Sequence, residues 1–353
     1  MKRIKILSPG FGTPNGSAFL FPLILFNKYL RNCDIDVTIY SRFNSDLFDA
    51  DVIGVDSKFH KHMWSIAEHK IFEQFDILKN QCKLLIYFDT TDSTGNLQTE
   101  IFDYVDIYCK GQVLKDRNKY QKPFYGNRIY SDYVHKKFNL NDNSPEVSKP
   151  LLSKKKIKKL KISWNSGLAD YSSYGPLLMK LYNYIPIKRL LSFKKEKKNY
   201  KDIEIHARFG SEYSRNTVAW QRKEISLLLK DIPKKKISRF KYFSELKKTK
   251  IVISPFGWGE ITLKDFESFM CNVLLFKPSM EHLATWPNFF VDNKTYIPFS
   301  WDLSDFIHKL EMIKKNYSDL EEIANFGREN YYNYASAKGA ENFTRHFQEI
   351  INQ

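Results

Sequence analysis

Cysteine is scarce in this chain of 353 residues, which contains only Cys33, Cys82, Cys109 and Cys271. Their spacing fits neither a CxxC motif nor a set of metal ligands, which argues against a disulfide framework or a zinc ribbon. We therefore expect small, buried free thiols in a reducing compartment.

Long apolar runs are lacking as well. The apolar segment 19–26 is far shorter than the roughly 20 residues that a membrane-spanning helix needs. The charged start, residues 1–7, is followed at once by Ser-Pro-Gly-Phe-Gly and not by the apolar core of a signal peptide. We therefore expect residues 2–7 to form a first strand in a cytoplasmic protein.

Several functional signatures are missing. The first glycine loop has the form Gly10-x-Gly12-x-x-x-Gly16, which departs from the dinucleotide fingerprint, and no acidic residue plainly fills the ribose role after the second strand. His60 and His62 do not share a helical face, and no HExxH motif occurs. We therefore expect no nicotinamide site, no metal and no bound cofactor.

Positive charge is abundant but uneven. The formal net charge is +16, and residues 149–250 hold 28 Lys and Arg against 8 Asp and Glu. Such a region attracts phosphate in nucleic acid, in anionic lipid headgroups or in phosphorylated small molecules. For any single lysine run, a solvated surface is the simpler explanation of the charge.

Strand and helix patterns alternate along both halves of the chain, which predicts parallel sheets with helices on their faces. A polar and then basic segment, 139–160, separates the halves. We predict an N-terminal domain over 1–150, a C-terminal domain over 151–325 that restarts with a strand at Leu160, and a helical tail over 326–353. The predicted strands are 2–7, 35–40, 51–55, 83–88, 105–109, 202–207, 237–240, 251–254 and 273–277. The main predicted helices are 18–31, 58–80, 220–230, 302–315 and 320–352.

The stretch from Ile251 to Glu267 has the most informative pattern. A short β-branched strand leads into Pro255-Phe-Gly-Trp-Gly259, and Thr262-x-x-Asp265 then resembles a capping box at a helix start. At 100° per residue, Glu267 falls on the edge of the buried arc of that helix. A carboxylate there needs a partner, and either a structural salt bridge or a ligand hydroxyl would provide one.

Two other regions carry candidate ligands. Asp89 and Asp92 follow the strongest strand of the first half, and ligands of open α/β sheets bind at the carboxyl ends of strands. Their roles are either helix capping or contact with a polyhydroxylated ligand, including general-base work. The basic and aromatic segment 110–138 could contact nucleic acid or sugar rings, and we interpret it as an amphipathic surface that packs on the sheet.

These motifs resemble a known family. Ser254-Pro-Phe-Gly-Trp-Gly-Glu260 with Lys264-Asp-Phe-Glu267 is similar to the donor-site motif of bacterial glycosyltransferases of the GT-B architecture, in particular the retaining family-4-type group. The stretch Phe88–Gly95, the tripeptide Lys115-Asp-Arg117 and the stretch 295–305 are similar to segments of enzymes that build O-antigen, capsule and related surface glycans. The resemblance implies two Rossmann-like domains that face each other across a cleft, with a C-terminal helix that returns to the N-terminal domain.

The resemblance also implies roles for individual residues. Glu267 matches the glutamate that binds the ribose hydroxyls of the nucleotide sugar, whereas Ser254 occupies the register of the first glutamate of the family motif, and Glu260 is displaced in a longer loop. The donor-binding candidates are Glu267, Lys264, Gly257, Trp258, Gly259, Ser254, Arg208 and Arg215. The catalytic candidates are Asp89, Asp92 and Glu260. The acceptor-binding candidates are Gly10, Gly12, Asp89 and Thr94.

The implied reaction moves a sugar from a UDP- or GDP-linked donor to a hydroxyl of a glycan or polyprenyl-linked acceptor, without metal. Cations and a helix N-terminus would stabilise the departing diphosphate. Asp89 or Asp92 would be the base of an inverting reaction and would orient the acceptor in a retaining one. The basic surface would also allow peripheral attachment to anionic lipid at the inner face of the membrane. The alternative is a non-catalytic nucleic-acid-binding protein, for which no helix-turn-helix, zinc or RRM signature is present.

Overall fold

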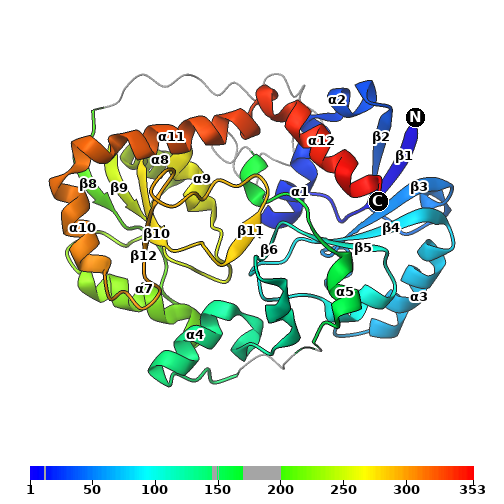
Figure 1. The fold of residues 1–353 in the computed structure, drawn as a ribbon, viewed down its shortest axis with the longest axis horizontal. Helices are drawn as coiled ribbons and strands as arrows, with labels where there is room; N and C mark the ends of the chain where they lie inside the picture. The colour runs from blue at the N-terminus through cyan, green and yellow to red at the C-terminus, as the bar shows by residue number, and fades with distance from the viewer. Residues whose placement is uncertain (12, 145–148, 150, 170–199) are drawn as a thin grey trace.

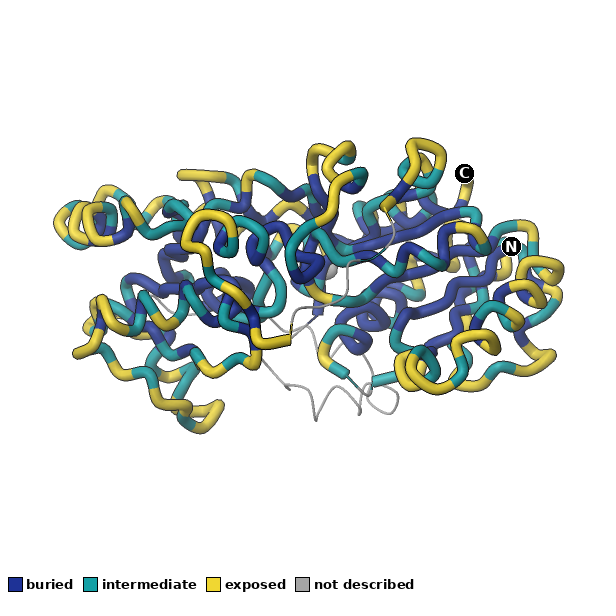
Figure 2. Tube along the Cα trace, turned by 90° about the horizontal axis from the view of Figure 1, so that it is seen from below, coloured by how far each residue is buried: buried dark blue, intermediate teal, exposed yellow. Residues whose placement is uncertain are grey.

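The computed structural model describes residues 1–11, 13–144, 149, 151–169 and 200–353, and it consists of two α/β halves (Figure 1). Each half is built on its own parallel sheet. The fold therefore confirms the two Rossmann-like halves expected from the alternating strand and helix patterns. Figure 2 shows buried segments inside both halves and exposed segments at their periphery.

The first sheet has six parallel strands in the order β2-β1-β3-β4-β5-β7. Because β2 and β3 lie on opposite sides of β1, the winding direction of the chain reverses there, and such a switch point opens a crevice at the carboxyl ends of the strands. The predicted strands of the first half are confirmed within one or two residues. The strands are β1 (Lys2–Leu7), β2 (Ile35–Tyr40), β3 (Ala50–Asp56), β4 (Cys82–Asp89), β5 (Ile107–Lys110) and β7 (Leu160–Ile162).

The strand at Leu160 is a correction to the sequence analysis. It was expected to open the second half, but it pairs with β5, with Tyr108 opposite Leu160, at the edge of the first sheet. The first sheet therefore extends beyond residue 150. The segment 139–160 is consequently not a link between the two sheets, and the chain passes to the second sheet only after β7.

The second sheet has four parallel strands in the order β12-β10-β9-β8. They are β8 (Ile203–His206), β9 (Thr249–Ile253), β10 (Leu274–Pro278) and β12 (Ile297–Phe299). The strand predicted at 237–240 is wrong, because Ser238 accepts a hydrogen bond from the backbone N–H of Lys241 and caps a helix at that point. An N-cap hydroxyl satisfies an otherwise unpaired helix donor, and this local bond outweighs the weak β-branched pattern.

The helices flank the sheets. They are α1 (Pro14–Leu25), α2 (Asn27–Asn32), α3 (Glu68–Lys79), α4 (Ile129–Phe138), α5 (Lys154–Lys159), α7 (Asn216–Leu228), α8 (Arg239–Lys247), α9 (Leu263–Met270), α10 (Phe306–Lys315), α11 (Tyr317–Ala335) and α12 (Ala340–Ile351). The predicted helix 18–31 begins earlier, because Thr13 caps it and Pro14 fits the first helical turn. The predicted helix 58–80 forms only from Glu68, and turns occupy the residues before it.

The C-terminal helices join the halves. Helix α11 packs on α9 in the second half, and α12 returns to the first half beside α2 (Figure 1). The rings of Phe26 and Phe343 lie 5.3 Å apart at this contact. The return of the C-terminal helix to the first half is therefore confirmed.

The segment 110–142 also crosses between the halves. Strand β6 (Gln112–Leu114) pairs antiparallel with β11 (Leu283–Thr285), and α4 packs against α7. The Phe138 and Trp220 rings stack at 4.2 Å. The expectation that this segment packs on the sheet is therefore confirmed in part. Val113, Leu114 and Tyr120 belong to the core of the first half, whereas α4 lies on the second half.

Within the described residues, no helix combines the length and the apolar character that crossing a bilayer requires. The four cysteines are all free, and Cys109 and Cys271 are buried as expected. Cys33, in contrast, is exposed at the end of α2.

Candidate functional site

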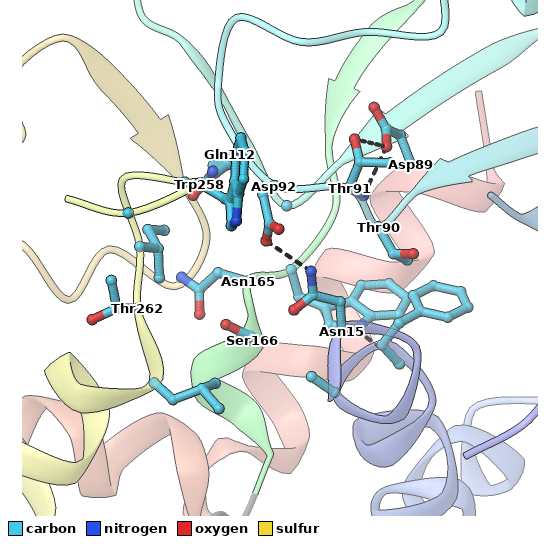
Figure 3. A pocket seen from close by; sticks show the side chains of 18 of the residues that line it. Asn15, Asp89, Thr90, Thr91, Asp92, Gln112, Asn165, Ser166, Trp258 and Thr262 are labelled. Atoms are coloured by element: carbon cyan, nitrogen blue, oxygen red, sulfur yellow. Dashed lines mark hydrogen bonds between the residues drawn. The ribbon is translucent and has the colours of Figure 1, made fainter. Parts of the chain in front are cut away.

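A cavity of about 260 Å³ lies between the two halves (Figure 3). Its walls come from the start of α1, from loops that follow β4 and β7 in the first sheet, and from the loop that connects β9 to α9 in the second half. The carboxyl ends of strands in both sheets therefore open onto one cavity, the position where ligands of such sheets bind. Its polar lining includes Asn15, Thr90, Thr91, Asp92, Gln112, Asn165, Ser166 and Thr262.

Asp92 is the exposed carboxylate of this cavity. Asn15 donates a hydrogen bond of 2.8 Å to its Oδ1, which joins the start of α1 to the loop after β4 (Figure 3). On the opposite side, Gly259 packs against the same loop, because an added Cβ there would lie 3.2 Å from the Asp92 Cβ. A side chain at this position would crowd the loop after β4, so glycine favours the close approach of the two halves.

Asp89 has a different environment. Its side chain and that of Lys110 are fully buried, and Lys110 Nζ lies 2.8 Å from Asp89 Oδ2. Tyr108 also donates to Oδ2, and Thr91 donates to Oδ1. Burial opposes ionisation, but Lys110 and these donors hold the pKa of Asp89 below its usual range. Asp89 lines the cavity, yet both of its oxygens already have donors within the protein.

The sequence analysis missed a buried carboxylate at the switch point of the first sheet. Asp56, at the end of β3, accepts hydrogen bonds from the Ser8 and Thr90 hydroxyls. Burial is the main cause that raises its pKa. Asp56 therefore fixes the loop after β1 against the loop after β4, beneath the first glycine loop.

The start of α9 is held in place by hydrogen bonds and a buried ion pair of Asp265. The predicted capping box is confirmed, since Thr262 N donates 2.8 Å to Asp265 Oδ2 and the Thr262 side chain accepts from the backbone in return. Ser254 donates 2.6 Å to Asp265 Oδ1, and the fully buried Lys277 Nζ lies 3.1 Å from Oδ2. Ser254 is thus part of this buried anchor and does not line the cavity.

Glu267 lies one turn further along α9 and is 8% exposed. Its Oε2 accepts a 2.9 Å hydrogen bond from Tyr242 on α8, and its Oε1 is 3.7 Å from Arg239 Nη1. Burial raises the pKa of Glu267 more than these two partners lower it. The carboxylate is therefore buried, as the helical spacing predicted. Tyr242 and Arg239 offset only part of the cost of burying its charge.

Positive groups gather beside Glu267. Lys264 donates to the backbone carbonyl of Arg208, whose guanidinium forms two hydrogen bonds with Glu245. Burial and the nearby Arg222 lower the pKa of Lys264 to about 7. Lys264, Arg208 and Glu267 thus form one group at the carboxyl edge of the second sheet, although none of them lines the cavity.

Glu260 does not lie where a sugar-contacting residue would be expected. It is buried and points from the glycine loop into the contact between the halves, where its Oε2 accepts 3.0 Å from the backbone N–H of Thr94. Its Oε1 lies 3.6 Å from His282 Nε2. Although burial opposes ionisation, His282 and Thr94 lower its pKa. Neither Glu260 nor Thr94 lines the cavity, so the structure gives both a role in joining the halves.

The remaining predicted residues divide between three places. Gly257, Trp258 and Gly259 line the cavity, and Arg215 lies on the far side of Trp258 with its guanidinium 5.5 Å from the ring centroid. Gly10 adopts a left-handed conformation with φ +79° in the first glycine loop. Gly12 lies outside the described residues.

Several cavity residues were missed by the sequence analysis. Asn165 and Ser166 follow β7, and they would have been predicted had that strand been placed in the first sheet. Arg222 on α7 donates to the carbonyl of Phe256 and lies 5.3 Å from the Tyr213 ring, beneath the glycine loop. A single arginine on an amphipathic helix gives no sequence signal of this contact.

Among the residues that the structure describes, no group of three or more His, Cys, Asp or Glu side chains could hold a metal ion. Metal independence remains a prediction that a chelator tests.

No family model matches the chain, and a search of curated proteins also gave no match. Solved structures with a similar course of the chain include a glycosyltransferase from Rickettsia africae, at 10% identity and TM-score 0.47, with 100% of this chain and 99% of that chain covered. HepE of Anabaena in complex with UDP and glucose has 8% identity and TM-score 0.47, with both chains covered fully. An α-glucosyltransferase in complex with UDP-glucose and DNA containing an abasic site has 9% identity and TM-score 0.44, with 99% of each chain covered.

Proposed function

We propose that this protein is a glycosyltransferase that moves a sugar from a nucleotide-sugar donor to a hydroxyl of an acceptor. The observation that carries the proposal is the cavity between the carboxyl edges of two parallel sheets, with hydroxyl groups from both halves and carboxylate and amide groups from the first half. Such groups suit the many hydroxyls of a sugar, whereas a nucleic-acid-binding surface requires accessible cations along a groove.

The second half supplies groups suited to the donor. The start of α9 faces the cavity through Thr262 and Leu263, and a helix N-terminus stabilises negative charge. Glu267 offers acceptor oxygens for ribose hydroxyls, and Lys264 and Arg208 place positive charge beside it. This arrangement stabilises a departing diphosphate without metal, in agreement with the resemblance of the motif to glycosyltransferases.

The first half supplies groups suited to the acceptor. Asp92 is the exposed carboxylate of the cavity and is available to orient or deprotonate a hydroxyl, whereas the oxygens of Asp89 are occupied by Lys110, Tyr108 and Thr91. We therefore assign Asp92 to the acceptor. Asp89 is assigned to the positioning of the loop that carries Asp92.

UDP or GDP is expected to raise the melting temperature of the protein, because a ligand that binds only the folded state stabilises it. At a concentration of 100 times Kd, the gain is about 2.7 kcal/mol. The measurement is thermal denaturation with each nucleoside diphosphate, in the presence and in the absence of EDTA. EDTA is expected to leave the shift unchanged. Absence of any nucleotide shift, together with steeply salt-dependent binding to DNA or RNA, would instead support the nucleic-acid-binding alternative.

A place in surface-polysaccharide assembly is the finer part of the proposal, with a glycan or polyprenyl-linked acceptor at the inner face of the membrane. The basic composition of residues 149–250 supports it, since each basic residue near an anionic surface contributes about 1 kcal/mol. Co-sedimentation is therefore expected with liposomes that contain anionic lipid, and not with neutral ones. Equal binding to both, or to neither, would contradict attachment through charge.

A further inference from the structure

Among the residues that the structure describes, a single lysine or arginine lines the cavity between the two halves. It is Arg222 of α7, whose side chain is partly exposed. Lys264 and Arg208, the cations expected at a diphosphate, lie outside the cavity wall. Lys264 donates to a backbone carbonyl, and the Arg208 guanidinium is held by Glu245. The positive charge that a ligand in the cavity can contact therefore belongs to Arg222.

The guanidinium of Arg222 is fixed by backbone carbonyls before any ligand arrives. Its Nε donates 2.6 Å to Phe256, its Nη1 donates 2.9 Å to Gly210, and its Nη2 donates 3.3 Å to Pro255. A guanidinium has five N–H groups, so these bonds leave one on Nη1 and one on Nη2. Two N–H groups on neighbouring nitrogens match the paired oxygens of a phosphate.

Within the described chain, no carboxylate forms an ion pair with Arg222. The Asp265 carboxylate raises its pKa from a distance but is itself bonded to Lys277 and Ser254. Burial is the largest influence on the pKa of Arg222 and lowers it, because the charge is held away from water. Such a cation is costly without a partner, and an anion bound beside it would offset that cost.

Gly257 keeps the guanidinium accessible. An added Cβ at Gly257 would lie 3.0 Å from Arg222 Nη2 and 2.9 Å from the Tyr213 hydroxyl, so a side chain there would crowd both groups. The start of α9 lines the same cavity through Thr262 and Leu263, and the positive end of a helix dipole adds to the attraction for an anion. All of these groups belong to the second half.

We propose that Arg222 binds the diphosphate of the nucleotide-sugar donor directly, with Lys264 and Arg208 acting on it only at longer range. The inference rests on the proposed glycosyltransferase function and deepens it. The donor is favoured over the acceptor because Arg222, Gly257 and the start of α9 come from the half that carries Glu267, whereas Asp92 comes from the other half.

The test compares ligands with and without the diphosphate. Titration calorimetry is carried out with UDP, GDP, uridine and guanosine at constant ionic strength. Arg222→Gln is expected to weaken binding of the preferred diphosphate about tenfold or more, because it removes hydrogen bonds between charged groups. Binding of the matching nucleoside is expected to remain unchanged. A diphosphate affinity equal to that of wild type would overturn the inference.

Lys223→Gln is the matched control, since it removes the same charge from the next residue of α7, which is exposed and does not line the cavity. Equal weakening by both variants would show only a general effect of charge and would overturn the inference.

Arg222→Lys separates contact with the ligand from support of the glycine loop, because it keeps the charge but loses the planar set of donors. It is expected to bind the diphosphate more tightly than Arg222→Gln and less tightly than wild type. An affinity as low as that of Arg222→Gln would show that Arg222 only supports the loop, and the inference would fail.

The dependence of diphosphate affinity on salt provides a second readout. It is expected to be weaker in Arg222→Gln than in wild type and in Arg222→Lys, because one charge contact is lost. The same dependence in all three proteins would contradict a direct contact. Failure of the proposed function itself is distinguishable, because wild type would then bind neither UDP nor GDP.

Discussion

Glu267→Gln is expected to abolish the stabilisation of the protein by UDP or GDP, while the ligand-free protein remains at least as stable as wild type at pH 7. The amide retains the shape of the side chain but loses the charge that ribose hydroxyls donate to. Hydrogen bonds to charged groups contribute about 1.5–3 kcal/mol each, so the loss of two would remove most of a nucleotide shift. Thermal denaturation with and without nucleotide measures both effects.

The stability of the ligand-free variant follows from the pKa of Glu267. Burial, the largest cause, raises this pKa in the folded protein. A group with a raised folded pKa contributes stability at low pH, and that contribution is lost as pH rises from the unfolded pKa through the folded one. At pH 7 the ionised Glu267 therefore lowers the stability of the free protein, and a neutral amide removes this cost.

This pair of results separates the two explanations that the sequence left open. If Glu267 were chiefly a structural partner of Arg239, glutamine would lower the stability of the free protein and leave the nucleotide shift intact. The matched control is Glu281→Gln, the same change at an exposed glutamate, for which both quantities should remain at their wild-type values. A nucleotide shift that survives in Glu267→Gln would remove Glu267 from the donor site.

Local patterns predicted much of this molecule because their causes are local. The capping box at Thr262 depends on four consecutive residues, and the burial of Glu267 follows from the geometry of one helix. The strands of the first half end where polar residues follow an apolar run. These local features are sufficient to predict the loop between β9 and α9 and its position at the carboxyl edge of a sheet.

The pairing of distant segments could not be predicted in the same way. A three-residue strand such as β7 can join either sheet, and only its register with β5 decides. The packing of α4 on α7 and the contact of Glu260 with Thr94 also depend on how the halves meet. The cavity residues Asn165 and Ser166 were missed for this reason, since their role follows from the sheet to which β7 belongs.

Two buried ion pairs, which the sequence also could not predict, support the loops that line the cavity. Asp89 pairs with Lys110 behind the loop that carries Asp92, and Asp265 pairs with Lys277 behind the glycine loop. In each case the lysine lies on a neighbouring strand and has no sequence motif. Each half therefore holds its cavity loop against a buried charge pair, which fixes the loop but makes it dependent on both members.

Lys110→Met is expected to destabilise the first half by about 3–5 kcal/mol at pH 7, because it leaves the Asp89 carboxylate buried without its cation. Loss of the positive charge removes the main influence that lowers the pKa of Asp89, and burial then raises that pKa. The wild-type carboxylate contributes stability above its unfolded pKa and loses it in acid. The variant carboxylate instead costs stability at pH 7 and recovers it as it becomes protonated.

Hydrogen exchange of the β4 and β5 amides at pH 7, with urea unfolding at pH 7 and pH 5, measures these effects. The matched control is Lys83→Met. Lys83 lies on β4, the strand that carries Asp89, and pairs at 2.9 Å with Asp51, but its side chain is 83% exposed. An exposed pair contributes about 0–1 kcal/mol, so this control should change little. The difference between Lys110→Met and wild type should narrow at pH 5. Two results would contradict this prediction: a loss of unfolding free energy no larger than that of Lys83→Met, or a loss that grows in acid. Either would show that the Asp89 carboxylate does not depend on Lys110. The loop that carries Asp92 would then be held by other contacts.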